Sequence, residues 1–87
     1  LLLNGFMACI EVDDFTNAFY FKKQIEKNFF EENETYFRIV YLWAEGLLDS
    51  KQGRVEEGLR KMEDALRIFE MIGCSKSADF YRSAMER

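Results

Sequence analysis

The residues that could do chemistry are few in this chain and lie far apart. The sequence has no histidine, so it lacks the commonest general base and the commonest metal ligand. Two carboxylate pairs, Asp13–Asp14 and Glu31–Glu32, suggest acid–base work by their types alone. Both pairs lie in expected loops beside helix starts, where acidic side chains interact favourably with the helix dipole. We interpret them as capping and solubilising residues and predict no catalytic residue.

The two cysteines, Cys9 and Cys74, stand far apart and have no neighbouring cysteine or histidine. A zinc site needs clustered ligands, and a disulfide framework in so small a chain needs more cysteines. We therefore predict two buried thiols in a reducing cytoplasm. The glycines stand singly, so no phosphate-binding loop is present. The sequence predicts no cofactor and no metal.

Length and charge narrow the function classes further. A chain of 87 residues is at most one small domain, and its net charge of −4 argues against a nucleic-acid grip. Residues 1–12 are too short and too mixed to span a membrane, so we expect a cytoplasmic protein with no membrane partner. The chain starts on Leu1 without an initiator methionine. We expect it to be a fragment of a larger protein that begins inside or near a helix.

Helical spacing of apolar residues occurs almost everywhere, proline is absent, and no run alternates as a strand would. The spacing predicts helices over residues 1–11, 15–29, 34–52 and 54–72, followed by a last short helix. Asp13 or Asp14 is the expected cap of the second helix, and Ser75 or Ser77 that of the last. Gly53 and Gly73 are the expected left-handed residues that end the two long helices.

The fourth predicted helix is amphipathic. Its first apolar stripe consists of Val55, Leu59, Met62, Leu66 and Phe69, and a second beside it of Gly58, Ala65, Ile68 and Ile72. Pairs at i, i+4 predict ion pairs on the solvated face, namely Glu56–Arg60, Glu57–Lys61 and Glu63–Arg67.

Part of the sequence resembles a tetratricopeptide unit, which is a pair of antiparallel helices with small residues at fixed places. In "EGLLDSKQGRVEEGLRKMEDALRIFE", Gly46 and Gly58 would let the two helices approach and Gly53 would make the turn. Upstream, "DDFTNA" echoes "GRVEEG", although the spacing from Ala18 to Gly58 is 40 residues. A standard unit has about 34. We predict an all-α fold in which antiparallel hairpins stack as a tetratricopeptide-like α-solenoid fragment, with a C-terminal capping helix. The predicted parts are 1–30, 34–73 and 75–87.

The third predicted helix is apolar nearly all round. Tyr36, Val40, Trp43 and Leu47 recur on one side of it. Core packing is one interpretation of this stripe. The other is a groove, because the first helix of each stacked pair faces the concave surface, which receives peptides or helices. The sequence leaves the two interpretations open.

The final two-thirds of the chain resembles the C-terminal part of the Rgg/GadR/MutR family of bacterial transcriptional regulators. An aromatic-rich helix, a glycine turn, the helix "MEDALRIFEMIG" and a terminal helix with an aromatic pair carry the resemblance. The positions that match are Gly46, Gly53, Met62, Ala65, Leu66, Ile68, Phe69, Ile72, Gly73, Ala78, Phe80 and Tyr81.

The resemblance implies a function in transcription regulation and quorum sensing, without enzyme activity. Such proteins have an N-terminal helix-turn-helix and a helical-repeat domain that binds a short signalling peptide and helps form a homodimer. DNA contact would then belong to sequence outside this chain. Phe80, Tyr81 and Met85 are the candidate dimer or capping surface. The alternative function is a general tetratricopeptide-type scaffold that binds segments of protein partners.

Overall fold

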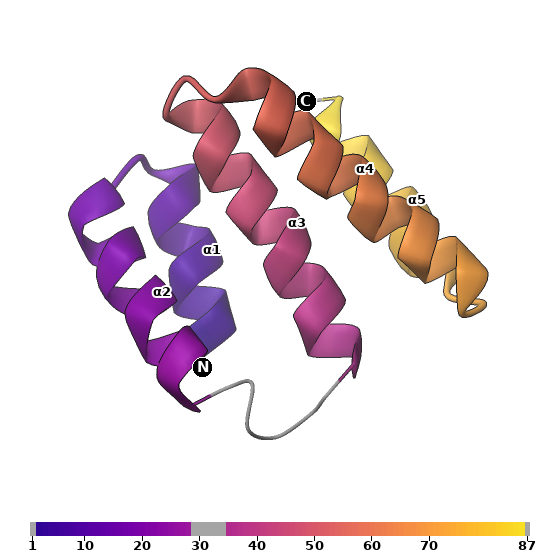
Figure 1. The fold of residues 1–87 in the computed structure, drawn as a ribbon, viewed down its shortest axis with the longest axis horizontal. Helices are drawn as coiled ribbons and strands as arrows, with labels where there is room; N and C mark the ends of the chain where they lie inside the picture. The colour runs from indigo at the N-terminus through magenta and orange to yellow at the C-terminus, as the bar shows by residue number, and fades with distance from the viewer. Residues whose placement is uncertain (1, 29–34, 87) are drawn as a thin grey trace.

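The fold consists of α-helices, in a computed structural model that describes residues 2–28 and 35–86 (Figure 1). The helices are α1 (Leu2–Glu11), α2 (Phe15–Asn28), α3 (Thr35–Lys51), α4 (Val55–Met71) and α5 (Ser75–Met85). These ranges contain no strand, so the all-α prediction is confirmed, and the helix bounds lie within about one residue of those expected. The predictions that fall on Leu1, Phe29 and residues 31–34 lie outside the described residues.

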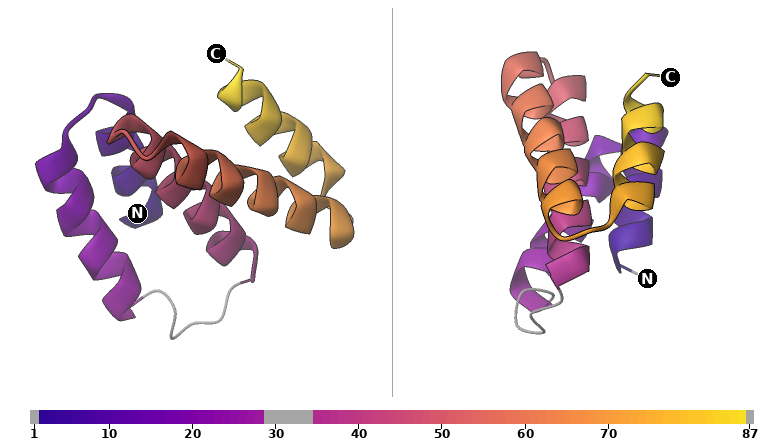
Figure 2. Two further views of the ribbon diagram at one scale, coloured as in Figure 1. Left: turned by 45° about the horizontal axis from the view of Figure 1, so that its top comes forward. Right: turned by 90° about the vertical axis from the view of Figure 1, so that its right-hand side faces the viewer.

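The central element is α3. It pairs with α4, α1 pairs with α2, and α5 folds back along α4 (Figure 1). Two further views place α1 and α5 on the same side of α3 (Figure 2). The division into a first pair, a second pair and a capping helix, and their stacking as a tetratricopeptide-like solenoid, stay predictions.

The turns α1–α2, α3–α4 and α4–α5 share one backbone geometry. Each contains a residue in the left-handed region, with φ of 59° at Asp13, 94° at Gly53 and 83° at Gly73. The next residue donates its N–H to the carbonyl five positions earlier, which satisfies a free carbonyl of the ending helix. These bonds run from Asp14 to Cys9 (2.8 Å), from Arg54 to Asp49 (2.9 Å) and from Cys74 to Phe69 (2.7 Å).

A small buried residue follows each of these turns at the same distance. Ala18, Gly58 and Ala78 each come five residues after the left-handed residue, and each is buried. The predicted echo between "DDFTNA" and "GRVEEG" is therefore confirmed, and it extends to a third turn. A small side chain here lets the second helix of each pair lie close to the first.

The closest approach is between α3 and α4. A Cβ on Gly46 would lie 2.6 Å from the carbonyl oxygen of Gly58, and a Cβ on Gly58 would collide with the carbonyl oxygen of Gly46. The two helices therefore touch backbone to backbone, as the sequence predicted for these glycines.

The helix caps agree with the sequence at one end of the molecule and differ at the other. The Asp14 carboxylate accepts the N–H of Asn17 at 3.3 Å, which confirms Asp14 as a cap of α2. The prediction of Ser75 or Ser77 as the cap of α5 is wrong, because the N-cap is Cys74 and makes no side-chain capping bond. The turn after Gly73 starts the helix at once, so both serines already lie within it.

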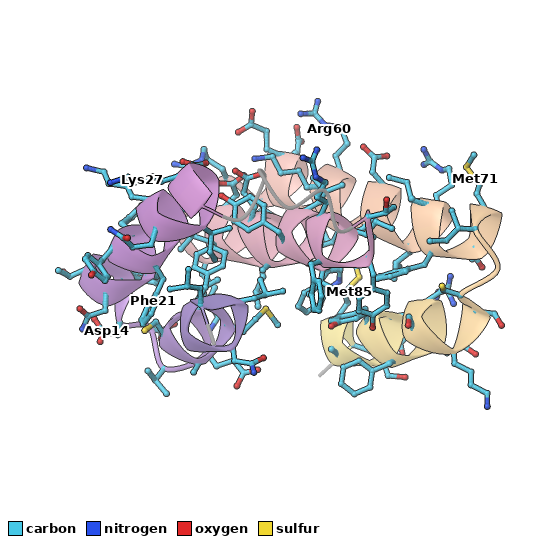
Figure 3. The ribbon with its side chains drawn as sticks, turned by 90° about the horizontal axis from the view of Figure 1, so that it is seen from below. Asp14, Phe21, Lys27, Arg60, Met71 and Met85 are labelled. Carbon is cyan, nitrogen blue, oxygen red and sulfur yellow. The ribbon has the colours of Figure 1, made fainter. Side chains whose placement is uncertain are left out.

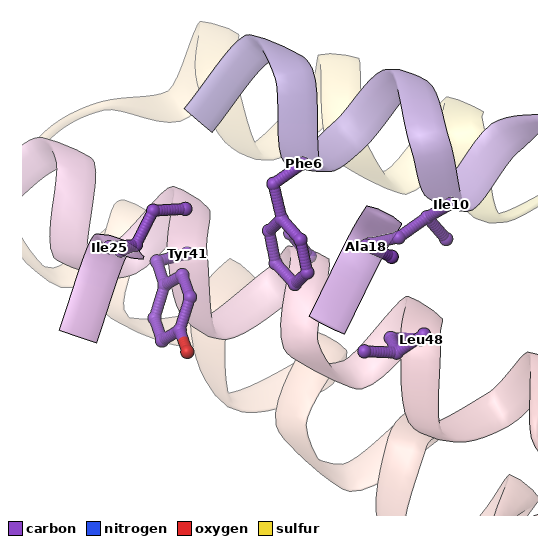
Figure 4. Close-up of a cluster of buried hydrophobic side chains, with 7 residues drawn as sticks. Phe6, Ile10, Ala18, Ile25, Tyr41 and Leu48 are labelled. Atoms are coloured by element: carbon purple, nitrogen blue, oxygen red, sulfur yellow. The ribbon is translucent and has the colours of Figure 1, made fainter. Parts of the chain in front are cut away.

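Two hydrophobic clusters form the core, and α3 contributes to both. The first joins α1, α2 and α3 through Phe6, Ile10, Ala18, Ile25, Tyr41, Ala44 and Leu48 (Figure 4). The second joins α3, α4 and α5 through Ile39, Val40, Trp43, Met62, Ala65, Phe69 and Ala78. Because α3 packs into both clusters, apolar residues occur on several sides of this helix.

The solvated surface of α4 differs from the sequence prediction. Val55, Leu59 and Ile72 are exposed, so only part of each predicted stripe is buried. Lys61 pairs with Asp49 and Glu45 of α3 rather than with Glu57, and Arg67 pairs with Asp64 rather than with Glu63. The i, i+4 rule assumes that both side chains face solvent, whereas Lys61 faces the neighbouring helix.

Candidate functional site

A hollow of about 360 Å³ opens where α1, α3 and α5 meet. Its floor is the first part of α3, and α1 and α5 lie on the same side of that helix (Figure 3). Helix α1 contributes Leu3, Asn4, Met7, Ala8 and Glu11, α3 contributes Tyr36, Phe37 and Val40, and α5 contributes Tyr81. We call this hollow the α1–α5 groove. Its lining is mainly apolar, and its volume is within the range of small-ligand pockets.

Two tyrosines hold the α5 side of the α1–α5 groove in place. The Tyr81 ring stacks on Phe69 with the ring centroids 5.7 Å apart, and it lies 4.9 Å from Trp43. The Tyr36 hydroxyl is 3.2 Å from the Ser77 hydroxyl, which joins the start of α3 to the first turn of α5. Burial raises the pKa of Tyr81. The Tyr81 ring is thus an uncharged part of the lining near neutral pH.

The predicted stripe on α3 divides between the groove and the core. Tyr36, with 41% of its surface exposed, and Val40 line the α1–α5 groove. Trp43 is 3% exposed and belongs to the second hydrophobic cluster, and Leu47 packs partly buried against both clusters. Val40 is also a buried member of the second cluster, so core packing applies to Val40, Trp43 and Leu47, and a peptide groove along the stripe stays a prediction.

The three residues of the predicted dimer or capping surface have different surroundings. Phe80 is 62% exposed and contacts Tyr81 edge to face at 5.0 Å. Tyr81 lines the groove, and Met85 packs partly buried against the second cluster (Figure 3). Tyr81 and Met85 thus hold α5 on the domain, while Phe80 is the exposed member.

The α1 side of the groove was not predicted from the sequence. Its apolar members there, Leu3 and Met7, are four residues apart and so share one helix face, while Phe6 and Ile10 occupy the face toward the first cluster. The sequence signal for this side was the presence of two apolar stripes on one ten-residue helix. The stripe of Leu3 and Met7 could not be assigned to a groove without knowing that α5 lies on the same side of α3 as α1.

An ion-pair network joins α4 to the C-terminal part of α3, outside the groove lining. Asp49 is 6% exposed and accepts hydrogen bonds from Lys61 at 2.7 Å and Arg54 at 2.9 Å. Burial alone would raise the pKa of Asp49, but the bonds from Lys61 and Arg54 outweigh it and hold that pKa below its ordinary value. Burial would also lower the pKa of Lys61, and its bond to Asp49 reverses this and raises it.

Three further properties of the described residues concern metal ligands, cysteine pairing and membrane-spanning helices. Within residues 2–28 and 35–86, no group of three or more His, Cys, Asp or Glu side chains is placed to hold a metal ion. Cys9 and Cys74 are unpaired thiols, each partly buried. No helix in the described part of the chain is long and apolar enough to cross a membrane.

A comparison with known protein families assigns the chain to one of them. Residues 1–83 match the family described as HTH-type transcriptional regulator Rgg, C-terminal domain. The chain belongs to this family. The match confirms the resemblance seen in the sequence and shows that α1 and α2 belong to the Rgg domain together with the later helices. Comparisons with curated proteins and with solved structures gave no match.

The Rgg match covers every residue that lines the groove. All of them lie between Leu3 and Tyr81, inside the matched residues 1–83. The groove is therefore part of the Rgg C-terminal domain itself.

Proposed function

We propose that this domain senses a short, largely apolar peptide in the α1–α5 groove and takes part in forming a homodimer of its regulator. The observation that carries the proposal is the groove itself, an apolar hollow whose lining comes from three helices. A ligand held there would touch the central helix and the terminal helix at once. In this proposal, DNA contact belongs to a helix-turn-helix domain outside the chain.

The size of the groove supports a peptide over a bulkier occupant. A volume of about 360 Å³ accommodates a few side chains, which suits the anchor residues of a short peptide. A whole amphipathic helix from a protein partner would need a longer apolar trough. The general scaffold that binds protein segments is therefore the second candidate.

Tyr81 provides a physical route from ligand to regulator. It lines the groove, and it also anchors α5 through Phe69 and Trp43. A ligand that displaces this ring would change how α5 sits, and α5 carries the exposed Phe80. We propose Phe80 as the centre of the dimer contact.

Ala8→Trp tests the groove directly. Ala8 is exposed and lines the hollow, so an indole there would occupy it without disturbing the core. Peptides from the culture medium would be captured on the full-length protein, identified by mass spectrometry, synthesised and titrated by calorimetry. We expect saturable binding that Ala8→Trp weakens by at least about tenfold.

The matched control is Thr16→Trp, which adds the same ring at an exposed position of α2 and should leave binding unchanged. If no synthesised peptide gives a saturable titration with the unsubstituted protein, the sensing proposal is wrong. Equal affinity in Ala8→Trp would place the peptide elsewhere on the domain.

A further inference from the structure

The groove lining includes one carboxylate, that of Glu11, which forms no ion pair with another described residue. Glu11 is the last residue of α1 and is exposed, and its side chain makes no ion pair or hydrogen bond with residues 2–28 or 35–86. The other lining residues carry no formal charge at neutral pH: Leu3, Asn4, Met7, Ala8, Tyr36, Phe37, Val40 and Tyr81. Glu11 is therefore the single formally charged residue among the described residues that line the groove.

The neighbouring charges are already satisfied. The Asp13 carboxylate is 3.0 Å from the Lys51 ammonium, which also donates to the Ile10 carbonyl at 2.9 Å. The Asp14 carboxylate binds Asn17 through both of its oxygens. Lys51 thus pairs with Asp13 and leaves the Glu11 side chain unpaired.

Glu11 is the last residue of α1, where a negative charge does not stabilise the helix. The C-terminal end of a helix carries a partial negative charge, which repels an anion. Lys51 stabilises that end through the carbonyls of Ile10 and Glu11, at 2.9 and 3.4 Å, rather than through the Glu11 carboxylate. Because the Lys51 ammonium offsets the charge of the helix end, the negative potential at this end of the groove comes from the Glu11 carboxylate.

We infer that the α1–α5 groove selects a peptide with an apolar body and one positively charged group placed opposite Glu11. That group is a free N-terminal amine or a Lys or Arg side chain. The inference rests on the proposed function of the groove as a peptide site, and it adds the charge of the ligand. A peptide carboxylate at the same end is repelled by Glu11 and by the net charge of −4.

Three pools of synthetic peptides test the charge. Each peptide has about six residues, which extend to roughly 20 Å. The body is randomised over Leu, Ile, Val, Phe, Ala and Gly, and one end carries Lys, norleucine or Glu. Both ends of the peptide are tried for this residue. Blocking the termini by acetylation and amidation leaves this residue as the single charge.

Affinity selection on the full-length protein, followed by calorimetry on recovered sequences, should favour the Lys pool. We expect a Lys peptide to bind about fivefold tighter than its norleucine counterpart, and the Glu counterpart to bind weakest. The preference should shrink in high salt, because the pair is partly exposed.

Glu11→Gln should abolish the preference, and Glu11→Lys should invert it. Glu63→Gln is the matched control, an exposed glutamate on α4 outside the groove lining, and should retain the preference. Because Glu11 is exposed at a helix end, these variants should fold, which circular dichroism checks.

The outcomes separate this inference from the proposed function. If all three pools bind equally well and Ala8→Trp abolishes that binding, the groove is a peptide site and the charge inference is wrong. If no pool yields a binder, both the proposed function and the charge inference fail.

Discussion

At the scale of single residues, the Asp49 side chain of α3 forms ion pairs that connect α3 to α4. Its carboxylate is almost fully buried and bonds to Lys61 and Arg54, and Lys61 also lies 3.6 Å from Glu45. A buried carboxylate that loses its charge leaves both cations without their partner. Asp49 therefore holds α4 in register on α3, next to the glycine contact.

We predict that Asp49→Asn destabilises the domain by about 2 kcal/mol at neutral pH, below the full effect of a wholly buried pair because Lys61 is partly exposed. The pKa of Asp49 lies below its ordinary value of 3.8 in the folded state. The stabilisation is thus present above about pH 4 and is lost as pH falls through the folded pKa. Urea unfolding at about pH 7, 5 and 3 should show the difference between the two proteins narrowing at the lowest pH.

Asp64→Asn is the control, because the Asp64–Arg67 pair is solvent-exposed and contributes little. A difference between Asp49→Asn and the unsubstituted protein that stays constant down to about pH 3 would contradict the role assigned to this carboxylate.

The pairing of Asp49 with Lys61 could not be predicted from residue types and spacing alone. The spacing of Glu57 and Lys61 fits a surface pair on one helix, but Lys61 reaches Asp49 at 2.7 Å on another. Which face of α4 meets α3 depends on the fold as a whole. The same holds for Asp13, which takes the left-handed turn position that glycine occupies in the other two turns and pairs with Lys51.

At the scale of elements, the helices and their ends were largely predictable. Glycine at 53 and 73 and the acidic pair at 13–14 mark the turns, because left-handed backbone and capping depend on local residue type. The groove was only half predictable. Tyr36 and Val40 stand out on α3, but α1 becomes a wall of the hollow only because the fold places α1 and α5 on the same side of α3. Local patterns carry no information about such an arrangement of distant parts of the chain.

The glycine contact between α3 and α4 gives the prediction at this scale. Gly58→Ala should destabilise the domain by roughly 1–2 kcal/mol, because the new Cβ collides with the backbone at Gly46 and Ser50. This strain exceeds the gain of about 1 kcal/mol that alanine brings to a helix interior. Thermal unfolding should show a midpoint lower by roughly 4–15 °C.

Gly5→Ala is the matched control for the α3–α4 contact. Gly5 is also helical, but its new Cβ would meet only the Phe21 ring, at 2.8 Å, and a side chain can move aside. Its midpoint should change little. A Gly58→Ala protein as stable as Gly5→Ala would show that the helices do not need this close approach.

At the scale of the whole molecule, the proposed homodimer would centre on the exposed Phe80. It is 62% exposed although it lies beside the buried part of α5. In a dimer, an aromatic side chain at the centre of the contact typically dominates the binding free energy.

We predict that Phe80→Ser weakens self-association of the full-length protein by about tenfold in sedimentation equilibrium. Tyr20→Ser removes an aromatic ring of similar exposure from α2 and should leave self-association unchanged. Equal weakening by both variants, or by neither, would show that the dimer contact does not centre on Phe80.

Helix α3 contributes to both hydrophobic clusters, and this predicts which helices can unfold separately from the rest of the domain. Leu3, Met7 and Leu47 pack against both clusters, so the two halves of the core are continuous across α3. Helix α2 contributes to the first cluster and α5 to the second. Each can detach with the loss of one cluster, whereas α3 cannot unfold without the loss of both.

Native-state hydrogen exchange should therefore show the slowest amides in α3, at the free energy of global unfolding, with α2 and α5 exchanging through smaller openings. Tyr81→Ala should speed exchange in α5 much more than in α2, because this ring holds α5 to Trp43 and Phe69. Uniform acceleration in every helix would instead mean that the domain opens only as a whole. In that case, displacement of Tyr81 by a ligand could not move α5 independently of the other helices.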